Sequence, residues 1–260
     1  MRDRTLEAAG RALLDHIVLP PLTALQFLTL VPPLVRRAFT PQELGRAVGF
    51  FPLVGTLLGA LLLGLDRVIS PSLPAHLTSA LLLTTWVAAT GALHIDGFLD
   101  SLDGLFGGDT PDSRLEIMRD EAVGAFGLSS GVLLLMLKLA ALDALSDRTA
   151  ALLVAPTIAR WGISMGIFLF PYARAQGLGR AMKDETQWPQ ALLATISALA
   201  VAWLISGPMG WMAFGVAALL GWATSRLTLS RIPGLTGDVY GAVGELLELS
   251  ILLLYAFLNR

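Results

Sequence analysis

Three aspartates at helical spacing follow a long apolar run. They are Asp96, Asp100 and Asp103, at positions i, i+4 and i+7 of the segment LHIDGFLDSLDGLFGG (93–108). These positions fall on one stripe of a helix, where three carboxylates repel one another unless a cation lies between them. Hard divalent cations prefer such oxygen ligands, and Mg²⁺ usually shares its coordination shell with substrate phosphates. The stripe therefore predicts a Mg²⁺ site that binds a diphosphate.

The alternative interpretation is that these aspartates are helix caps and solvated loop charges. A single Asp after an apolar run is typical of that role, whereas three on one face, with His94 beside them, favour a ligand site. A reaction at this site also needs a general base. His94 and one free carboxylate are the two candidates.

A second acidic segment, GLTGDVYGAVGELLELS, lies far along the chain. Asp238 precedes a predicted helix and is interpreted either as a further ligand of the same site or as a plain helix cap. Glu245 and Glu248 lie inside the apolar run that follows, where ionisable residues are candidates for function. Glu245 is seven residues after Asp238 and can share its face, so Glu245 is a candidate for substrate binding.

Basic residues are available to neutralise a diphosphate. Arg119 and Asp120 lie on a short amphipathic segment and are predicted at the rim of the site, with interfacial salt bridges as the alternative. Arg160 lies inside an apolar run, and either contacts a substrate phosphate or pairs with Glu245 or Glu248. The other candidates for phosphate binding, in the segment PYARAQGLGRAMKDETQ, are Arg174, Arg180 and Lys183.

The composition indicates that the domain that positions these residues lies in a membrane. Of 260 residues, 55% are hydrophobic and only 15% are charged, with a mean hydropathy of +0.69, whereas soluble domains are about one quarter charged. The chain is therefore predicted to be one integral membrane domain over 1–260. A net charge of −2 does not suggest nucleic acid, and the lack of cysteine excludes disulfides, zinc thiolate sites and cysteine nucleophiles.

The fold class is predicted as all-α, a polytopic bundle of about seven transmembrane helices (six to eight) with short amphipathic cytoplasmic helices. A polar or amphipathic lead-in at 1–16 and a shallow, re-entrant or interfacial segment at 17–35 come first, an eighth span being the alternative for the latter. SGPMG at 206–210 predicts a tight helical hairpin, and Lys138 is expected to extend its amine towards the membrane edge. The predicted spans are 47–65, 77–95, 122–142, 149–170, 189–206, 208–225 and 239–258.

Successive loops alternate between a larger and a smaller number of lysine and arginine residues. The richer loops are 96–121, 171–188 and 226–238, which the positive-inside rule assigns to the cytoplasm. The acidic stripe is therefore predicted to face the cytoplasm of a bacterial or archaeal cell, in a multi-pass protein of the cytoplasmic (inner) membrane.

Five ordered blocks over nearly the whole length resemble the cobalamin synthase family, the adenosylcobinamide-GDP ribazoletransferases. They are FFPLVGTLLGALL, GALHIDGFLDSLDGLFGG, RLEIMRDEAVGAFG, PYARAQGLG and GLTGDVYGAVGELLE. Ile95 and Leu99 depart from the family pattern, and neither replaces a carboxylate.

This resemblance implies a Mg²⁺-dependent membrane transferase that completes cobalamin. It would join adenosylcobinamide-GDP to α-ribazole or α-ribazole 5′-phosphate, release GMP, and yield adenosylcobalamin or its 5′-phosphate. Besides its two substrates, the transferase would contact membrane lipid, and a homo-oligomer is compatible with the sequence. The implied metal ligands are Asp96, Asp100, Asp103 and Asp238.

Two other classes remain as alternatives. CDP-alcohol phosphotransferases also carry Asp stripes, but an Ala-Arg pair follows their Asp-Gly pair, whereas Phe98 and Leu99 follow Gly97 here. An ion-coupled transporter would use the charged residues inside the apolar runs as a relay. Such transporters usually show two similar halves, and the sequence has no clear internal repeat.

Overall fold

The computed structural model describes residues 17–258, so the predicted lead-in at 1–16 lies outside the described residues. Helices make up almost all of this part of the chain, which contains no β-strand. The predicted all-α class is therefore confirmed. The helices are α2 (Leu19–Leu28), α3 (Pro41–Ala47), the 3₁₀ helix η2 (Val48–Phe50), α4 (Phe51–Ile69), α5 (Ala75–Ala89), α6 (Leu93–Gly107), α7 (Pro111–Ile117), α8 (Ala125–Ala144), α9 (Thr149–Leu169), α10 (Leu178–Glu185), α11 (Trp188–Ser206), α12 (Pro208–Leu229) and α13 (Gly237–Leu258).

Six helices of the described chain are long and apolar enough to cross a membrane, with α3, η2 and α4 counted together. The pair α5 and α6 adds a seventh if the two form one bent span. This agrees with the prediction of about seven spans. Helix α2 has 10 residues, about half of the ~20 that a span needs, as expected for a shallow segment.

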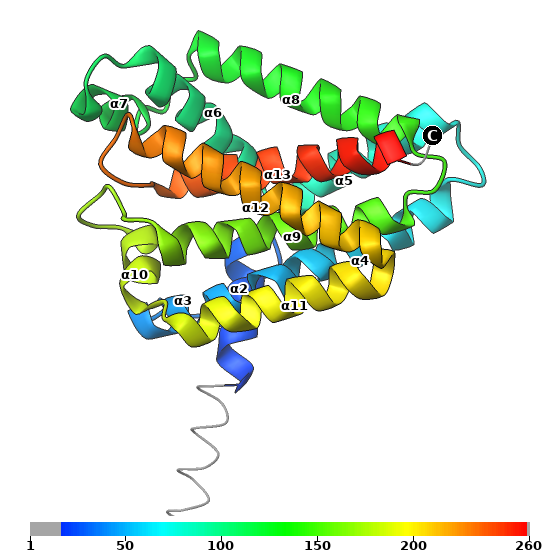
Figure 1. The fold of residues 1–260 in the computed structure, drawn as a ribbon, viewed down its shortest axis with the longest axis horizontal. Helices are drawn as coiled ribbons and strands as arrows, with labels where there is room; N and C mark the ends of the chain where they lie inside the picture. Colours follow the sequence, from blue (N-terminus) through cyan, green and yellow to red (C-terminus); the bar gives the residue numbers. More distant parts are fainter. Residues whose placement is uncertain (1–16, 259–260) are drawn as a thin grey trace, which may run out of the picture.

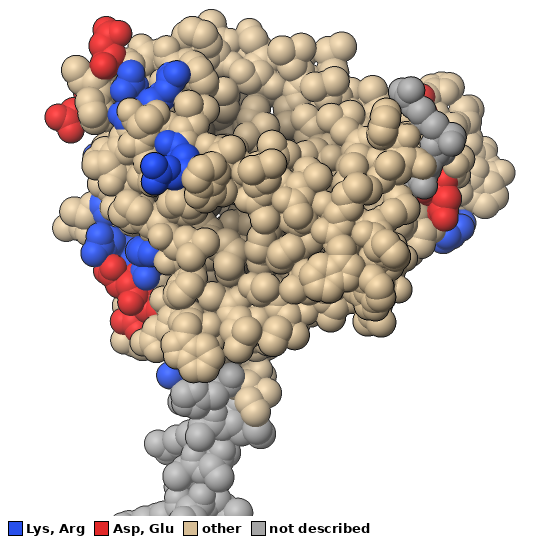
Figure 2. Space-filling model, in the orientation of Figure 1, with Lys and Arg blue, Asp and Glu red and all other residues tan. Residues whose placement is uncertain are grey.

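The long helices lie side by side, with α9 in the middle of the bundle (Figure 1). Helix α9 packs against α4, α11, α12 and α13, and 78% of the residues in its most apolar 18-residue stretch are buried. Figure 2 shows charged side chains at two ends of the molecule and a broad belt without charge between them. Large apolar side chains are exposed to the surroundings there, as in a lipid-facing surface, and include Leu192, Ile196, Trp203, Leu204, Trp211 and Trp222.

The predicted hairpin between the two charge-free spans is confirmed. Helix α11 ends at Ser206, Gly207 adopts a φ of 53°, and α12 begins at Pro208. A Cβ on Gly210 would lie 2.0 Å from the carbonyl oxygen of Ala202, so the two backbones touch. Small residues that permit such close contact are typical of helix pairs in membranes.

The predicted span at 77–95 is not one continuous helix, because the helix breaks inside it. Helices α5 and α6 are bent by 85° at residues 90–92, where Gly91 and Ala92 both adopt a positive φ, 60° and 56°. The backbone N–H of Leu30 donates to the carbonyl of Ala89 at 2.9 Å, which provides a partner at the break. As a result the aspartate stripe lies on a helix of its own, α6, rather than in the predicted loop at 96–121.

Candidate active site

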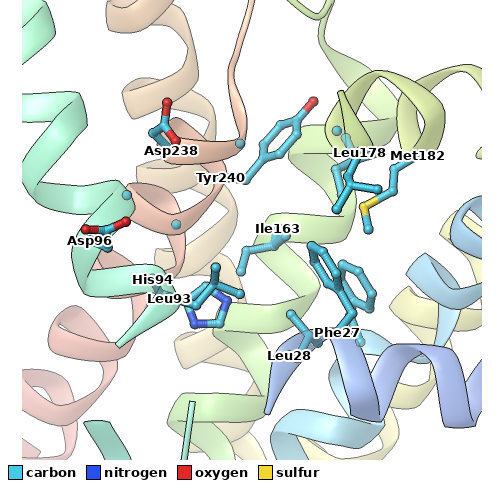
Figure 3. Close-up of a pocket in the computed structure, with 16 residues that line it drawn as sticks. Phe27, Leu28, Leu93, His94, Asp96, Ile163, Leu178, Met182, Asp238 and Tyr240 are labelled. Atoms are coloured by element: carbon cyan, nitrogen blue, oxygen red, sulfur yellow. The ribbon is translucent and has the colours of Figure 1, made fainter. Parts of the chain in front are cut away.

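A cavity of about 230 Å³ lies where α6 and α13 meet α2, α4, α9 and α10. Figure 3 shows Asp96 and Asp238 on one side of it, and the side chains of Phe27, Leu178 and Met182 on the other. The cavity therefore combines an acidic side with an apolar side.

Two glycines allow α6 and α13 to touch at this point. A Cβ on Gly97 would lie 2.8 Å from the carbonyl oxygen of Asp238, and one on Gly241 would lie 3.0 Å from the carbonyl oxygen of His94. The contact brings the stripe and Asp238 together across a long sequence separation. The carboxylates of Asp96, Asp103 and Asp238 are all close enough to repel that of Asp100.

The carboxylates of Asp96 and Asp100 form no hydrogen bond or ion pair with any residue between 17 and 258. Asp96 is exposed and Asp100 is partly buried. No three His, Cys, Asp or Glu side chains of the described chain are placed to hold a metal ion by themselves. Mg²⁺ usually takes one or two carboxylates and completes its shell with water and substrate phosphates. Two unpaired carboxylates beside a third acid fit such a shared ion.

Asp103 has a different environment. Its two carboxylate oxygens accept hydrogen bonds of 2.8 Å from the backbone N–H groups of Gly124 and Gly127, at the start of α8. These are two of the N–H groups that a helix N-terminus leaves without partners. Asp103 therefore caps α8, as the alternative interpretation of the stripe proposed, and its role as a metal ligand stays a prediction.

Replacing Asp103 by Ala is expected to lower the free energy of unfolding by about 1–2 kcal/mol, because two helix N–H groups lose their acceptor. Asp103→Asn keeps one acceptor and is expected to lose about half as much. Thermal unfolding in detergent measures both variants. Asp109→Ala is the control, since Asp109 is exposed in the loop after α6, and an Asp103→Ala protein as stable as this control would contradict the capping role.

Arg174 is the predicted phosphate-binding residue that pairs with an acid of the cavity lining, although Arg174 itself does not line the cavity. Its Nη2 donates to Oδ2 of Asp238 at 2.7 Å, and its Nε is buried without a partner in the described chain. The hydroxyl of Thr236 accepts the N–H of Val239 at 3.2 Å. Thr236 is therefore the residue that caps α13, and the alternative role of Asp238 as the helix cap is wrong.

Arg119 and Asp120 lie at the surface, after α7. Both are exposed, and Asp120 accepts a hydrogen bond from the backbone N–H of Ala122 at 3.1 Å. Arg119 is close enough to act electrostatically on Tyr172. The rim position of Arg119 stays a prediction, and the structure gives Asp120 a local turn contact.

Arg180 and Lys183 lie on α10, and both have partners outside the cavity lining. Arg180 pairs with Asp184 at 2.8 Å on the helix surface. Lys183 donates to the carbonyl of Phe168 at 2.8 Å, near the end of α9. Burial lowers the pKa of Lys183, while the charge of Asp184 raises it. Neither residue lines the cavity.

A network of four charged side chains is buried behind the cavity. Lys138 Nζ lies 2.5 Å from Glu245 Oε2 and 2.5 Å from Glu248 Oε2, and Arg160 pairs with the other oxygen of Glu248. Two cations and two anions balance, as buried charges require. The salt bridge offered as the alternative for Arg160 is therefore present, and neither Arg160 nor Glu245 lines the cavity. The expected exposure of the Lys138 amine is wrong, because Lys138 faces α13 and is 2% exposed.

His94 connects this network to the cavity that it lines. The Nη2 of Arg160 lies 3.5 Å from its Nδ1. A guanidinium can only donate, so Nδ1 is the acceptor and the ring hydrogen is on Nε2. His94 is thus positioned as a hydrogen-bond donor, which leaves a free carboxylate as the better candidate for the general base.

Two tyrosines complete the site and were not predicted. Tyr240 lines the cavity, and its buried hydroxyl has no partner among residues 17–258. Its ring stacks on that of Tyr172, with centroids 6.1 Å apart. Tyr172 forms a parallel bridge with Leu235, and burial raises the pKa of Tyr172. The bridge joins the loop before α10, which contains Arg174, to the loop before α13, the helix that begins with Gly237 and Asp238.

Residues 20–256 match the protein family described as cobalamin-5-phosphate synthase. An adenosylcobinamide-GDP ribazoletransferase of Pseudomonas syringae pv. syringae (strain B728a) is 41% identical over 246 residues, which cover 93% of this chain and 100% of the relative. Relatives with the same description in Desulfitobacterium hafniense (strain Y51) and Desulforamulus reducens (strain ATCC BAA-1160 / DSM 100696 / MI-1) are 39% and 36% identical, and cover 88% and 89% of this chain and 93% of each relative. No solved structure matches the chain significantly.

Proposed function

The chain belongs to the cobalamin-5-phosphate synthase family, and from this premise we propose that it is a membrane transferase for the final assembly step of cobalamin. It joins adenosylcobinamide-GDP to α-ribazole or α-ribazole 5′-phosphate and releases GMP. The similarity spans nearly the full length of the chain and of its relatives, so it supports the whole reaction. The observation that carries the chemistry is the pair of free carboxylates, Asp96 and Asp100, beside Asp238.

The reaction is a phosphoryl transfer. A ribose hydroxyl oxygen of α-ribazole attacks the phosphorus next to the cobinamide arm, and the bond from that phosphorus to the bridging oxygen of the diphosphate breaks. GMP leaves with the electron pair, and the hydroxyl proton passes to a base. We assign that base to Asp96 or Asp100, because the ring hydrogen of His94 is on Nε2 and makes His94 a donor to a substrate oxygen.

Asp238 and whichever of Asp96 and Asp100 is not the base would hold Mg²⁺ together with the diphosphate. The ion supplies neutralisation of the charge that develops on the phosphate oxygens. The oxygens of Asp103 are occupied by α8, so we leave Asp103 out of this set. Arg174 carries the unpartnered Nε described above, and is the cation that this chain offers to the leaving phosphate.

We further propose that the end of the bundle with α7 and α10 faces the cytoplasm of a bacterial cell. The loops between α6 and α8, between α9 and α11, and between α12 and α13 lie together at that end (Figure 1). They correspond to the loops that are richer in lysine and arginine, which supports this orientation.

Removing divalent metal is expected to lower turnover at least hundredfold, since Lewis-acid stabilisation is worth several kcal/mol. GMP release by the purified protein in lipid would be measured with adenosylcobinamide-GDP and α-ribazole, first with a chelator and then with added Mg²⁺. Thermal unfolding with the same chelator controls for loss of structure. Unchanged turnover in the chelator would contradict the proposed metal dependence, and no GMP release under any condition would contradict the proposed function.

The geometry does not support the alternative of an ion-coupled transporter. Arg160, Glu245 and Glu248 belong to a charge-balanced network with Lys138, and none of the four lines the cavity. A relay needs groups that exchange an ion with a water-filled path, whereas these residues are buried and paired.

A further inference from the structure

The apolar side chains that line the cavity come from five helices, α2, α4, α6, α9 and α10. Phe27 of α2 and Phe51 of α4 are stacked, with their ring centroids 6.1 Å apart and their planes at 11°. Leu178 and Met182 of α10 lie across from Asp96 and Asp238 (Figure 3). The other apolar side chains that line the cavity are Leu28, Leu93, Ile163 and Ile167.

The cavity is too small for a corrinoid. Its volume of about 230 Å³ is below the ~300–1,000 Å³ of pockets that enclose a drug-sized ligand. A corrin macrocycle with its side chains must therefore lie outside it. The smaller aromatic parts of the two substrates remain, which are the guanine nucleotide of adenosylcobinamide-GDP and α-ribazole.

The side chains that line the cavity favour one of these two groups, the guanine nucleotide or α-ribazole, over the other. Guanine carries a carbonyl, a ring N–H and an amino group, each of which needs a hydrogen-bond partner when it is buried. Among the described residues, the polar side chains that line the cavity are His94, Asp96, Asp238 and Tyr240. The benzimidazole base of α-ribazole has methyl groups on its edge and a single ring nitrogen as acceptor, so its burial against the apolar side costs less than that of guanine.

We propose, on the basis of the function proposed above, that this cavity is the α-ribazole subsite. The base lies against the apolar side, and the ribose lies against the polar side, which holds Asp96. Tyr240, two residues after Asp238, also lines the cavity. The corrinoid and its diphosphate then approach from outside, next to Asp100 and Arg174.

Replacing Leu178 by Trp tests the subsite, because the larger side chain fills the cavity from its rim. Leu178 is 59% exposed, so the change does not overpack the core. The expected result is an increase of about tenfold in both the Kd and the KM for α-ribazole, with the KM for adenosylcobinamide-GDP changed less than about twofold. The Kd is measured by calorimetry in lipid nanodiscs with α-ribazole alone, and the KM values come from GMP release.

Leu169→Trp is the matched control. Leu169 is 61% exposed at the end of α9 and does not line the cavity, so this variant should behave as the unmodified protein does. A second variant, Leu178→Ala, keeps the fold and removes part of the apolar side, and should also weaken α-ribazole binding.

The outcomes distinguish a failure of the subsite proposal from a failure of the proposed function. An unmodified protein that binds α-ribazole but releases no GMP would overturn the proposed function and leave the subsite in place. A protein that releases GMP, but whose Leu178→Trp variant keeps its affinity for α-ribazole or loses affinity for adenosylcobinamide-GDP instead, would overturn the subsite.

Discussion

Replacing Asp100 by Asn is expected to lower turnover by about a thousandfold or more in a protein that stays folded. The amide has the shape of the carboxylate but not its charge, and the shared ion and diphosphate lose several kcal/mol of stabilisation, at 1.36 kcal/mol for each factor of ten in rate. Because the Asp100 carboxylate has no partner within residues 17–258, its removal leaves no buried group unpaired. GMP release in lipid at saturating Mg²⁺ measures the effect.

Asp109→Asn is the control for this variant. Asp109 is an exposed aspartate at the same end of the molecule, and its substitution should leave turnover unchanged. Near-normal turnover of the Asp100→Asn protein would show that the assignment of the metal to the stripe is wrong. An unfolded protein is detected by thermal unfolding of the same preparation.

Replacing Lys138 by Met is expected to lower the free energy of unfolding by about 3–5 kcal/mol, the cost of breaking a buried ion pair from one side. Lys138 is the only cation bonded to Glu245 among the described residues, so the substitution leaves Glu245 charged and unpaired inside the bundle. Glu248 keeps Arg160. Unfolding by denaturant in mixed micelles gives the difference.

The double variant Lys138→Met/Glu245→Gln tests the electrostatic origin of this loss. It restores charge balance with Arg160 and Glu248, and should recover much of the stability that the single variant loses. Equal loss in the single and double variants would point to packing as the cause. A single variant as stable as the unmodified protein would contradict the network.

The break between α5 and α6 could not be predicted from hydropathy. The stretch across it is apolar, contains no proline, and has Gly91 as its only conventional signal. The second residue with a left-handed backbone is Ala92, a residue type that favours helices. Spacing did predict that Asp96, Asp100 and Asp103 lie on one helix, but not that this helix turns away from the span before it.

The other differences between the predicted and the observed site arise from contacts with segments that are distant in the sequence. The spacing of the stripe could not reveal that α8 begins beside Asp103 and takes up its oxygens. The position of Lys138 in its apolar run gives its depth in the membrane, but not the helix it faces. The meeting of Asp238 with the stripe was predicted from topology, since both lie at the same end of their spans. Tyr240, two residues further on, has no comparable signal.

The buried network has a consequence for the biosynthesis of the protein. Lys138 precedes Glu245 by 107 residues, and Arg160 precedes Glu248 by 88, so both cations leave the ribosome long before either counterion exists. The nascent chain must shelter two positive charges with water or lipid headgroups until α13 has been synthesised. Translation that stops short of α13 leaves both charges uncompensated in the bilayer. Helix α13 is therefore the segment that locks the bundle.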